Sequence, residues 1–232
     1  TVKKFYKEVL PRGTGDSFSI FLDEHPLKTP RKKPFVLPNA EIAAAIAEEW
    51  RSDSDEISPS EMVLTKLANS ALDSVAEHRE ITIDEISGFA ETDLVCYRSG
   101  EPLELRDQQD REWGALLDWM SRELNISLSS TDSILPLAQN RRDLNKVRCV
   151  VASFDDYSLA GLHMLTLACG SVVIGLAAAF EEVDERRAWE LSLLEESYQI
   201  DNWGEDPEAT KRREGLRLDI AAATRFLALL RN

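Results

Sequence analysis

An acidic side chain interrupts an apolar stripe in the segment WELSLLEESYQIDNWGED, residues 189–206. At about 100° per residue, four apolar residues share one narrow arc of a helix, with Glu196 in its middle. These four are Trp189, Leu193, Ile200 and Trp203. Because an isolated buried carboxylate is unfavourable, we expect Glu196 to be paired, protonated or exposed for use. One interpretation bonds it to an arginine or to backbone N–H groups. The other makes it a contact carboxylate in an apolar patch shaped for a partner protein.

A second acidic residue, Asp93 in TDLVCYR, could form a carboxylate pair with Glu196. Such pairs perform general acid–base chemistry, and a small hydrolase would need both groups within about 10 Å. The structural alternative is that Asp93 and Arg98 pair and fix a turn around the apolar LVCY; a further reading makes this segment the lip of a binding surface. The sequence contains no GxSxG, HExxH, P-loop or GxGxxG motif to favour an enzyme.

Cysteine and histidine spacing gives no support for a metal site or a disulfide framework. The residues are Cys96, Cys149, Cys169, His25, His78 and His163. The cysteine count is odd, no two cysteines have CxxC spacing, and the histidines are far apart. We therefore expect no metal, no cofactor and a reducing compartment.

The composition is that of a folded, soluble protein. The 232 residues are 43% hydrophobic and 30% charged, and the net charge is −15. A strongly negative average surface argues against nucleic acid or an anionic membrane as partner. The basic PRKKP at 30–34 is interpreted as a solvated hairpin tip.

Strand patterns in residues 1–38 give way to helical spacing from Asn39, which is a plausible N-cap. We predict an α+β fold, with a small β-rich domain and junction helix at 1–60 and an all-helical domain at 61–232. The later helices are expected at about 80–93, 104–125, 140–152, 157–180, 182–202 and 206–231. Trp50, Trp113 and Trp119 are expected in the core.

Residues 157–180 contain no Asp, Glu, Lys or Arg and are long enough to span a membrane. Their flanks are acidic, no tryptophan stands at either end, and Gly161, Gly170 and Gly175 lower the hydrophobicity. We therefore expect one buried central helix, around which the others pack, rather than a membrane-inserted segment.

A series of motifs resembles one protein family across nearly the whole chain. They are KKFYKEV, LDEHPLKTPRKKPFVLP, IAEEW, MVLTKLANSALD, TDLVCYR, QQDREWGALLDW, GSVVIGLA and LLEESYQIDNWGEDPE. Their order and spacing resemble the assembly chaperone that handles the alpha subunit of the F-type ATP synthase catalytic head. The chain departs from that family at Glu24 and His25, usually Gly and Arg, at Val63, usually Pro, and at Asp53, often Gln.

The resemblance implies a small β-rich domain, a larger helical domain and no catalytic activity. It implies a chaperone that binds the free alpha subunit, prevents its aggregation and promotes assembly with beta. The family's important glutamate carries over to Glu196, so Trp189, Leu193, Ile200 and Trp203 are expected around a partner contact. The protein is expected to be monomeric when free, in a bacterial cytoplasm or, in a eukaryote, the mitochondrial matrix.

Overall fold

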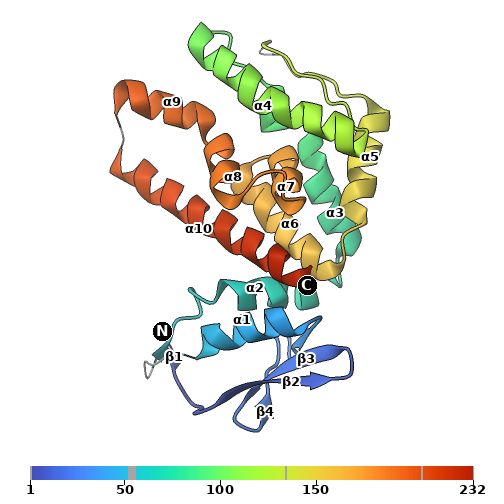
Figure 1. The fold of residues 1–232 in the computed structure, drawn as a ribbon, viewed down its shortest axis with the longest axis vertical. Helices are drawn as coiled ribbons and strands as arrows, with labels where there is room; N and C mark the ends of the chain where they lie inside the picture. The colour runs from blue at the N-terminus through green and yellow to red at the C-terminus, as the bar shows by residue number, and fades with distance from the viewer. Residues whose placement is uncertain (1, 52–55, 134, 205, 232) are drawn as a thin grey trace. The chain divides into compact units, whose positions relative to one another are not determined.

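A computed structural model describes residues 2–51, 56–133, 135–204 and 206–231 (Figure 1), so Asp53 lies outside the described residues. The chain forms two compact units. Unit 1 comprises the residues up to Arg79, Asp155–Gly161 and the residues from Arg225 onward. Unit 2 comprises Glu80–Phe154 and Leu162–Thr224. A small antiparallel sheet near the N-terminus and a larger helical part confirm the predicted α+β class, whereas the domain boundary at residue 60 stays a prediction.

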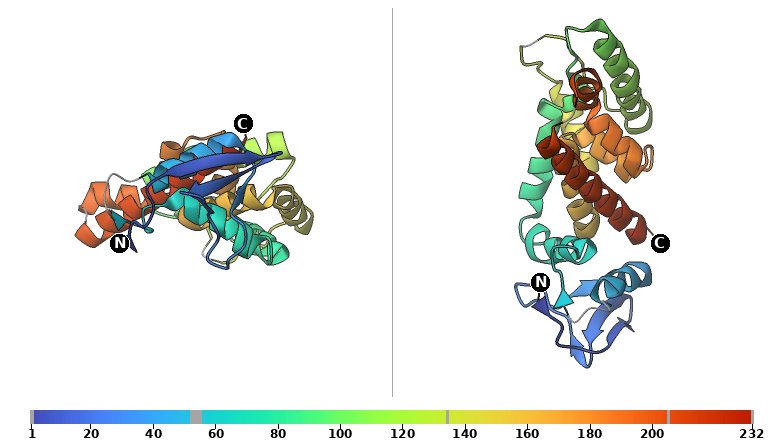
Figure 2. Two further views of the ribbon diagram at one scale, coloured as in Figure 1. Left: turned by 90° about the horizontal axis from the view of Figure 1, so that it is seen from below. Right: turned by 90° about the vertical axis from the view of Figure 1, so that its left-hand side faces the viewer.

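Unit 1 contains an antiparallel sheet with strand order β2-β3-β4, in which β5 also pairs with β3. The strands are β2 (Val9–Thr14), β3 (Ser17–Leu22), β4 (His25–Pro26) and β5 (Val36–Leu37), and a separate pair joins β1 (Val2–Lys3) to β6 (Glu56–Ile57). Gly15, at φ +64°, makes the β2–β3 turn. Helix α1 (Ala40–Trp50) packs on this sheet (Figure 2), and its Ile42 and Ile46 side chains are buried.

Side-chain caps fix the first helices of unit 1. Asn39 accepts a hydrogen bond from the backbone N of Ile42 at 2.9 Å, which confirms the predicted N-cap. Helix α2 (Val63–Ser70) receives its cap from α1, because the Glu49 carboxylate accepts from the backbone N of Leu64 and Thr65 at 2.7 and 2.8 Å. These orphan N–H groups are therefore satisfied by a residue about 15 positions earlier in the chain.

The basic PRKKP segment is only partly the solvated tip that the sequence predicts. Lys32 is exposed and has a left-handed backbone with φ +64°. Arg31 and Lys33 instead pair with Glu77, and the buried Asp73 accepts from the backbone N of Arg31 at 3.1 Å. Asp73 belongs to a π-helical turn, η1 (Ala71–Val75), so the hairpin is tied to this turn.

The remaining regular elements of the described chain are helical. In order they are α3 (Arg79–Gly88), the short turns η2 (Phe89–Glu91) and η3 (Leu94–Cys96), α4 (Leu103–Leu124), α5 (Arg141–Ala152), α6 (Asp156–Cys169), α7 (Val172–Ala179), α8 (Glu185–Ser192), α9 (Leu194–Trp203) and α10 (Pro207–Leu230). Trp113 and Trp119 are buried, as predicted, whereas Trp50 is only half-buried.

The single helix predicted at 157–180 is wrong, because the segment forms two helices. Gly170 takes φ +62°, which ends α6, and the Ser171 side chain then caps α7 by accepting from the backbone N of Ile174. All eight residues of α7 are buried, so the predicted buried apolar helix is this shorter one. No helix in the described ranges has the length and apolar character needed to cross a membrane.

The buried start of α7 is capped by Asp93, which is 0% exposed. Its carboxylate accepts from the Ser171 hydroxyl at 2.6 Å and from the backbone N of Val172 and Val173 at 2.8 and 3.3 Å. Burial raises the pKa of Asp93 to about 6, although these hydrogen bonds lower it.

The predicted pairing of Asp93 with Arg98 is wrong. Arg98 donates from Nε to Asp110 at 2.8 Å and also to the carbonyl oxygen of Val95, while its guanidinium lies 5.6 Å from the Trp113 ring. Asp93 and Arg98 therefore have separate partners, since Asp93 accepts from the backbone N–H groups of α7 and Arg98 donates to Asp110.

Helices α6 and α7 approach closely at Gly175. A Cβ at this position would lie 2.9 Å from the Thr166 hydroxyl oxygen and 3.4 Å from the Thr166 backbone. Both residues are buried, so the contact cannot open toward solvent.

We predict that Gly175→Ala lowers the free energy of unfolding by about 1–3 kcal/mol, because the added methyl group overpacks a closed interface. Gly114→Ala is the matched control, since a Cβ there meets no atom within 4 Å in the middle of α4. Helix propensity then predicts stabilisation of up to about 1 kcal/mol. Urea unfolding of both variants measures the difference, and two effects of equal sign would contradict the packing argument.

We predict that the stability difference between the wild type and Asp93→Asn changes with pH. The folded pKa of Asp93, about 6, lies above its unfolded value, so its contribution is full at low pH and is lost as pH rises through 6. The free energy of unfolding of the wild type minus that of the variant should be about 2 kcal/mol larger near pH 4.5 than near pH 7. Urea unfolding at the two pH values tests this, and a constant difference would mean that Asp93 stays ionised throughout.

A candidate partner-binding site on helices α8 to α10

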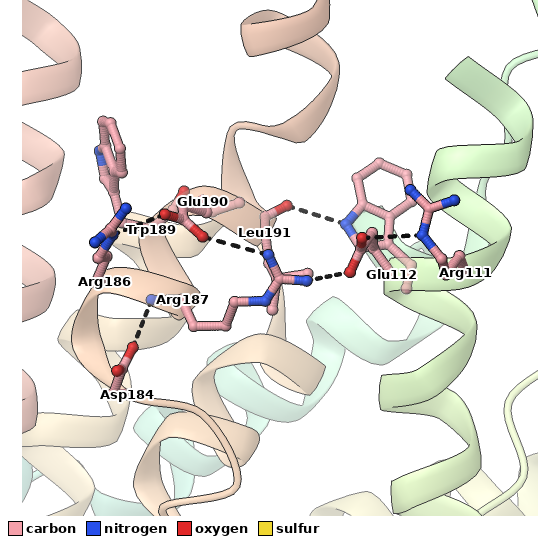
Figure 3. A network of polar contacts seen from close by, with 10 residues as sticks. Arg111, Glu112, Asp184, Arg186, Arg187, Trp189, Glu190 and Leu191 are labelled. Atoms are coloured by element: carbon pink, nitrogen blue, oxygen red, sulfur yellow. Dashed lines mark hydrogen bonds and ion pairs between the residues drawn. The ribbon is translucent and has the colours of Figure 1, made fainter. Parts of the chain in front are cut away.

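Helix α8 is held against α4 by a polar network (Figure 3). Asp184 caps α8 by accepting from the backbone N of Arg187 at 2.7 Å. The Arg187 side chain pairs with Glu112 of α4 and with Glu190, and the indole N–H of the buried Trp113 donates to the Leu191 carbonyl at 3.0 Å. Helix α8 therefore has a fixed position, from which Trp189 points away from Glu112 (Figure 3).

The continuous helix predicted at 182–202 is wrong, because a turn at Leu193 separates α8 from α9. Leu193 has φ −114° and ψ 19°, outside helical values. Its side chain is 6% exposed and that of Leu194 is 5% exposed, so burial of both leucines stabilises the turn. The ideal arc of the sequence analysis therefore does not continue through this position.

Glu196, in the first turn of α9, is paired with α10. Its side chain is 25% exposed and forms an ion pair with Arg212. Its Oε1 atom lies 3.8 Å from Arg213 Nη1, and this buried oxygen accepts no hydrogen bond from the described residues. The sequence left open whether Glu196 bonds to an arginine or to backbone N–H groups or contacts a partner protein. In this structure it is bonded to an arginine.

Arg213 joins Glu196 to Trp189. Its guanidinium lies 5.2 Å from the Trp189 ring, and its carbonyl oxygen accepts from the Trp189 indole N–H at 3.1 Å. It also donates to the Ser197 hydroxyl at 3.2 Å. We call Trp189, Glu196, Ser197, Arg212 and Arg213 the Glu196 cluster. The structure thus brings together two of the predicted site residues through a third residue that the sequence analysis missed.

The other predicted site residues differ in exposure. Leu193 is in the core, Ile200 is half-buried, and Trp203, the last residue of α9, is 77% exposed. Trp203 stands seven residues after Glu196, roughly 10 Å further along the helix axis. Gly204 follows as the C-cap of α9, with a φ of +88° that favours glycine.

A pocket of about 290 Å³ lies beside the Glu196 cluster. It is lined by Glu185, Arg186, Trp189, Arg217 and Ala221, from α8 and α10. Trp189 therefore contacts Arg213 and also lines this accessible pocket. The sequence signal for this side of the site is KRREGLR at 211–217, which places Arg213 and Arg217 one helical turn apart.

The carboxylate pair expected of a hydrolase is not formed by the described contacts. Asp93 is fully buried and caps α7, whereas Glu196 binds Arg212 on α10. Among the described residues, Asp93 and Glu196 have no bonding partner in common. In the described ranges no three His, Cys, Asp or Glu side chains gather where they could hold a metal ion.

Comparison with known proteins assigns the chain to a family. The family model described as ATP12 chaperone protein matches residues 3–121, about half of the chain. The mitochondrial atp12 protein of Schizosaccharomyces pombe is 24% identical over 214 residues, which cover 87% of this chain and 74% of that protein.

Solved bacterial structures are similar over almost the full chain. The crystal structure of Atp12 from Paracoccus denitrificans has a TM-score of 0.95 and 34% identity, covering 99% of this chain and 98% of the other. A single-residue mutant of the same protein gives the same values. A candidate chaperone from Agrobacterium tumefaciens has a TM-score of 0.91 and 33% identity, covering 98% and 86%. The chain therefore belongs to the ATP12 family of chaperones, which act in ATP synthase assembly.

Proposed function

We propose that this protein binds the unassembled alpha subunit of the F-type ATP synthase catalytic head, prevents its aggregation and promotes assembly of the alpha/beta hexamer. The observation that carries the proposal is the 34% identity to Paracoccus Atp12 over 99% of the chain. The relatives are mitochondrial and bacterial. We accordingly propose the mitochondrial matrix or a bacterial cytoplasm as the compartment, and a role without catalysis.

The physical need for such a chaperone follows from subunit assembly. A subunit of a stable hexamer buries large, mostly apolar surfaces against its neighbours, and these are exposed before assembly. Exposed apolar surface causes aggregation. The chaperone must cover that surface, yet must release it when the neighbouring subunit arrives.

The Glu196 cluster and Trp203 form the proposed contact surface. Trp203 supplies an exposed aromatic side chain of the kind that anchors interfaces. Glu196 supplies a carboxylate that is 25% exposed and is paired with the exposed Arg212, whose place an Arg or Lys of the client can take. In this proposal Trp189 and Ile200 border the contact, whereas the buried Leu193 positions α9 and touches the client least.

We predict that Glu196→Lys abolishes the ability to keep alpha soluble. A lysine beside Arg212 and Arg213 would repel both arginines and any cation of the client; loss of a desolvated charge contact costs about 2–5 kcal/mol, or roughly 30-fold or more in affinity. Glu195→Lys is the matched control, because Glu195 is exposed and makes the same charge change one residue away. Co-expression with alpha in the absence of beta measures the soluble fraction, with circular dichroism to check folding.

A charge exchange separates binding from folding at this position. The double variant Glu196→Arg with Arg212→Glu restores the internal ion pair but removes the carboxylate from position 196. If Glu196 contacts the client, this variant folds and still fails to retain alpha. Full rescue of alpha binding would show that Glu196 only joins α9 to α10.

We predict opposite effects at the two ends of α9. Trp203→Ala should leave the unfolding free energy within about 0.5 kcal/mol of the wild type, because the side chain is 77% exposed. It should weaken alpha binding by about 2 kcal/mol or more if it is an anchor. Leu193→Ala should instead lower the unfolding free energy by about 2–4 kcal/mol. Thermal unfolding and co-purification with alpha distinguish these effects, and unchanged binding by Trp203→Ala would remove Trp203 from the site.

A further inference from the structure

Unit 1 contains a pocket that the Glu196 cluster does not use. Its volume is about 260 Å³, and its lining is mainly apolar, with Leu27, Trp50, Ile57 and Met62 among the contributors. Pockets for drug-sized ligands and cofactors measure about 300–1,000 Å³. This pocket is therefore below the size of a nucleotide site and suits one or two side chains of a peptide.

The pocket walls are fixed by hydrogen bonds. The Trp50 indole N–H donates to the Thr65 hydroxyl at 3.2 Å, and Thr65 in turn donates to Glu49 at 2.7 Å. The hydroxyl of Thr29, another lining residue, donates to the buried Asp73 at 2.8 Å. A rigid pocket loses little conformational entropy when it is filled.

One polar group in the lining has no partner. The Oδ1 atom of Asn69 is buried and accepts no hydrogen bond from the described residues. An unsatisfied buried acceptor costs about 1–3 kcal/mol of stability. Because Asn69 lines the pocket, a turn of its side-chain amide toward the hollow would let a ligand supply the missing donor, as a peptide backbone N–H would.

The charged side chains that line the pocket are basic, although the whole chain carries a net charge of −15. The described lining includes Lys28 and Lys66 and no acidic residue. Both lysines are exposed, and Lys66 donates to the Ser60 carbonyl at the rim at 2.9 Å. A basic rim around an apolar hollow favours an acidic ligand with an apolar side chain.

We propose that this pocket is a second client-binding site, which takes one bulky apolar side chain from an Asp- and Glu-rich segment of the client. The proposal rests on the proposed chaperone function for the identity of the client. The apolar side chain fills the hollow, a backbone N–H of the segment donates to Asn69, and the flanking carboxylates lie near Lys28 and Lys66. The two lysines thus attract an acidic segment of the client, which the net negative charge of the chaperone would otherwise repel.

A defined peptide tests the pocket directly on the full chain. The probe is a fluorescein-labelled nine-residue peptide with one central leucine and four glutamates on each side. Fluorescence anisotropy should show binding that weakens about 10-fold or more when alanine replaces the leucine. A peptide with lysine in place of every glutamate should not bind. Affinity that is independent of the central residue would overturn the proposal.

Variants of the chaperone locate the binding. Lys66→Glu should weaken binding of the peptide about 5-fold or more, whereas Lys211→Glu, the same charge change on an exposed residue of α10, should not. Asn69→Leu should weaken peptide binding while raising the midpoint of thermal unfolding, because the unsatisfied oxygen is removed. If Lys66→Glu and Lys211→Glu weaken peptide binding equally, the attraction is a general effect of charge, and the pocket proposal is overturned.

The pocket and the chaperone function fail in different ways. If wild-type chaperone does not keep alpha soluble, the proposed function fails, while the peptide assay still decides the pocket. If Glu196→Lys loses alpha but no pocket variant binds the peptide or alpha less well, the pocket proposal fails alone. Sedimentation of the wild type checks for a dimer. If a dimer forms and Lys66→Glu abolishes it, the pocket binds a second copy of this chain, and the proposed client segment is overturned.

Discussion

The buried carboxylate of Asp93 is the constraint on which the helical unit depends. Helix α7 is buried along its whole length, so water cannot satisfy the free N–H groups at its start. Asp93 and Ser171 satisfy them, at the cost of holding an acid in the interior with its pKa raised to about 6. Because α7 packs against both α4 and α8, the cap also fixes the helix that carries Trp189.

Side-chain caps also satisfy the N-termini of other helices, and the capping residue lies at different distances along the chain from the helix it caps. Asn39 caps its own helix, Asp184 does the same for α8, Glu49 caps the next helix, and Asp93 caps one that begins almost 80 residues later. A distant cap adds a tertiary contact to a local hydrogen bond, so the position of the helix and its start are fixed together. The half-buried ion pairs at the surface contribute less to this order, because solvent screens them.

The class of fold and the local signals were predictable from residue patterns, whereas the partners of charged side chains were not. Strand patterns before Asn39, its N-cap and the buried apolar run all follow from side-chain chemistry. The breaks at Gly170 and Leu193 fall inside patterns that still read as helical, because periodicity tolerates a short turn. With 27 basic and 42 acidic residues, one sequence does not decide that Arg98 meets Asp110 or that Glu196 meets Arg212.

The exposure of the Glu196–Arg212 pair bears on how a chaperone can both hold and release. Glu196 is 25% exposed and Arg212 is 54% exposed, so solvent already screens the pair. Exposed pairs contribute about 0–1 kcal/mol, whereas breaking a fully buried one costs about 3–5 kcal/mol. A cation of the client could therefore replace Arg212 at small cost, and Arg212 could return as the client leaves. In the proposed function, this exchange fixes the register of the complex without making it permanent, and the apolar side chains supply the affinity.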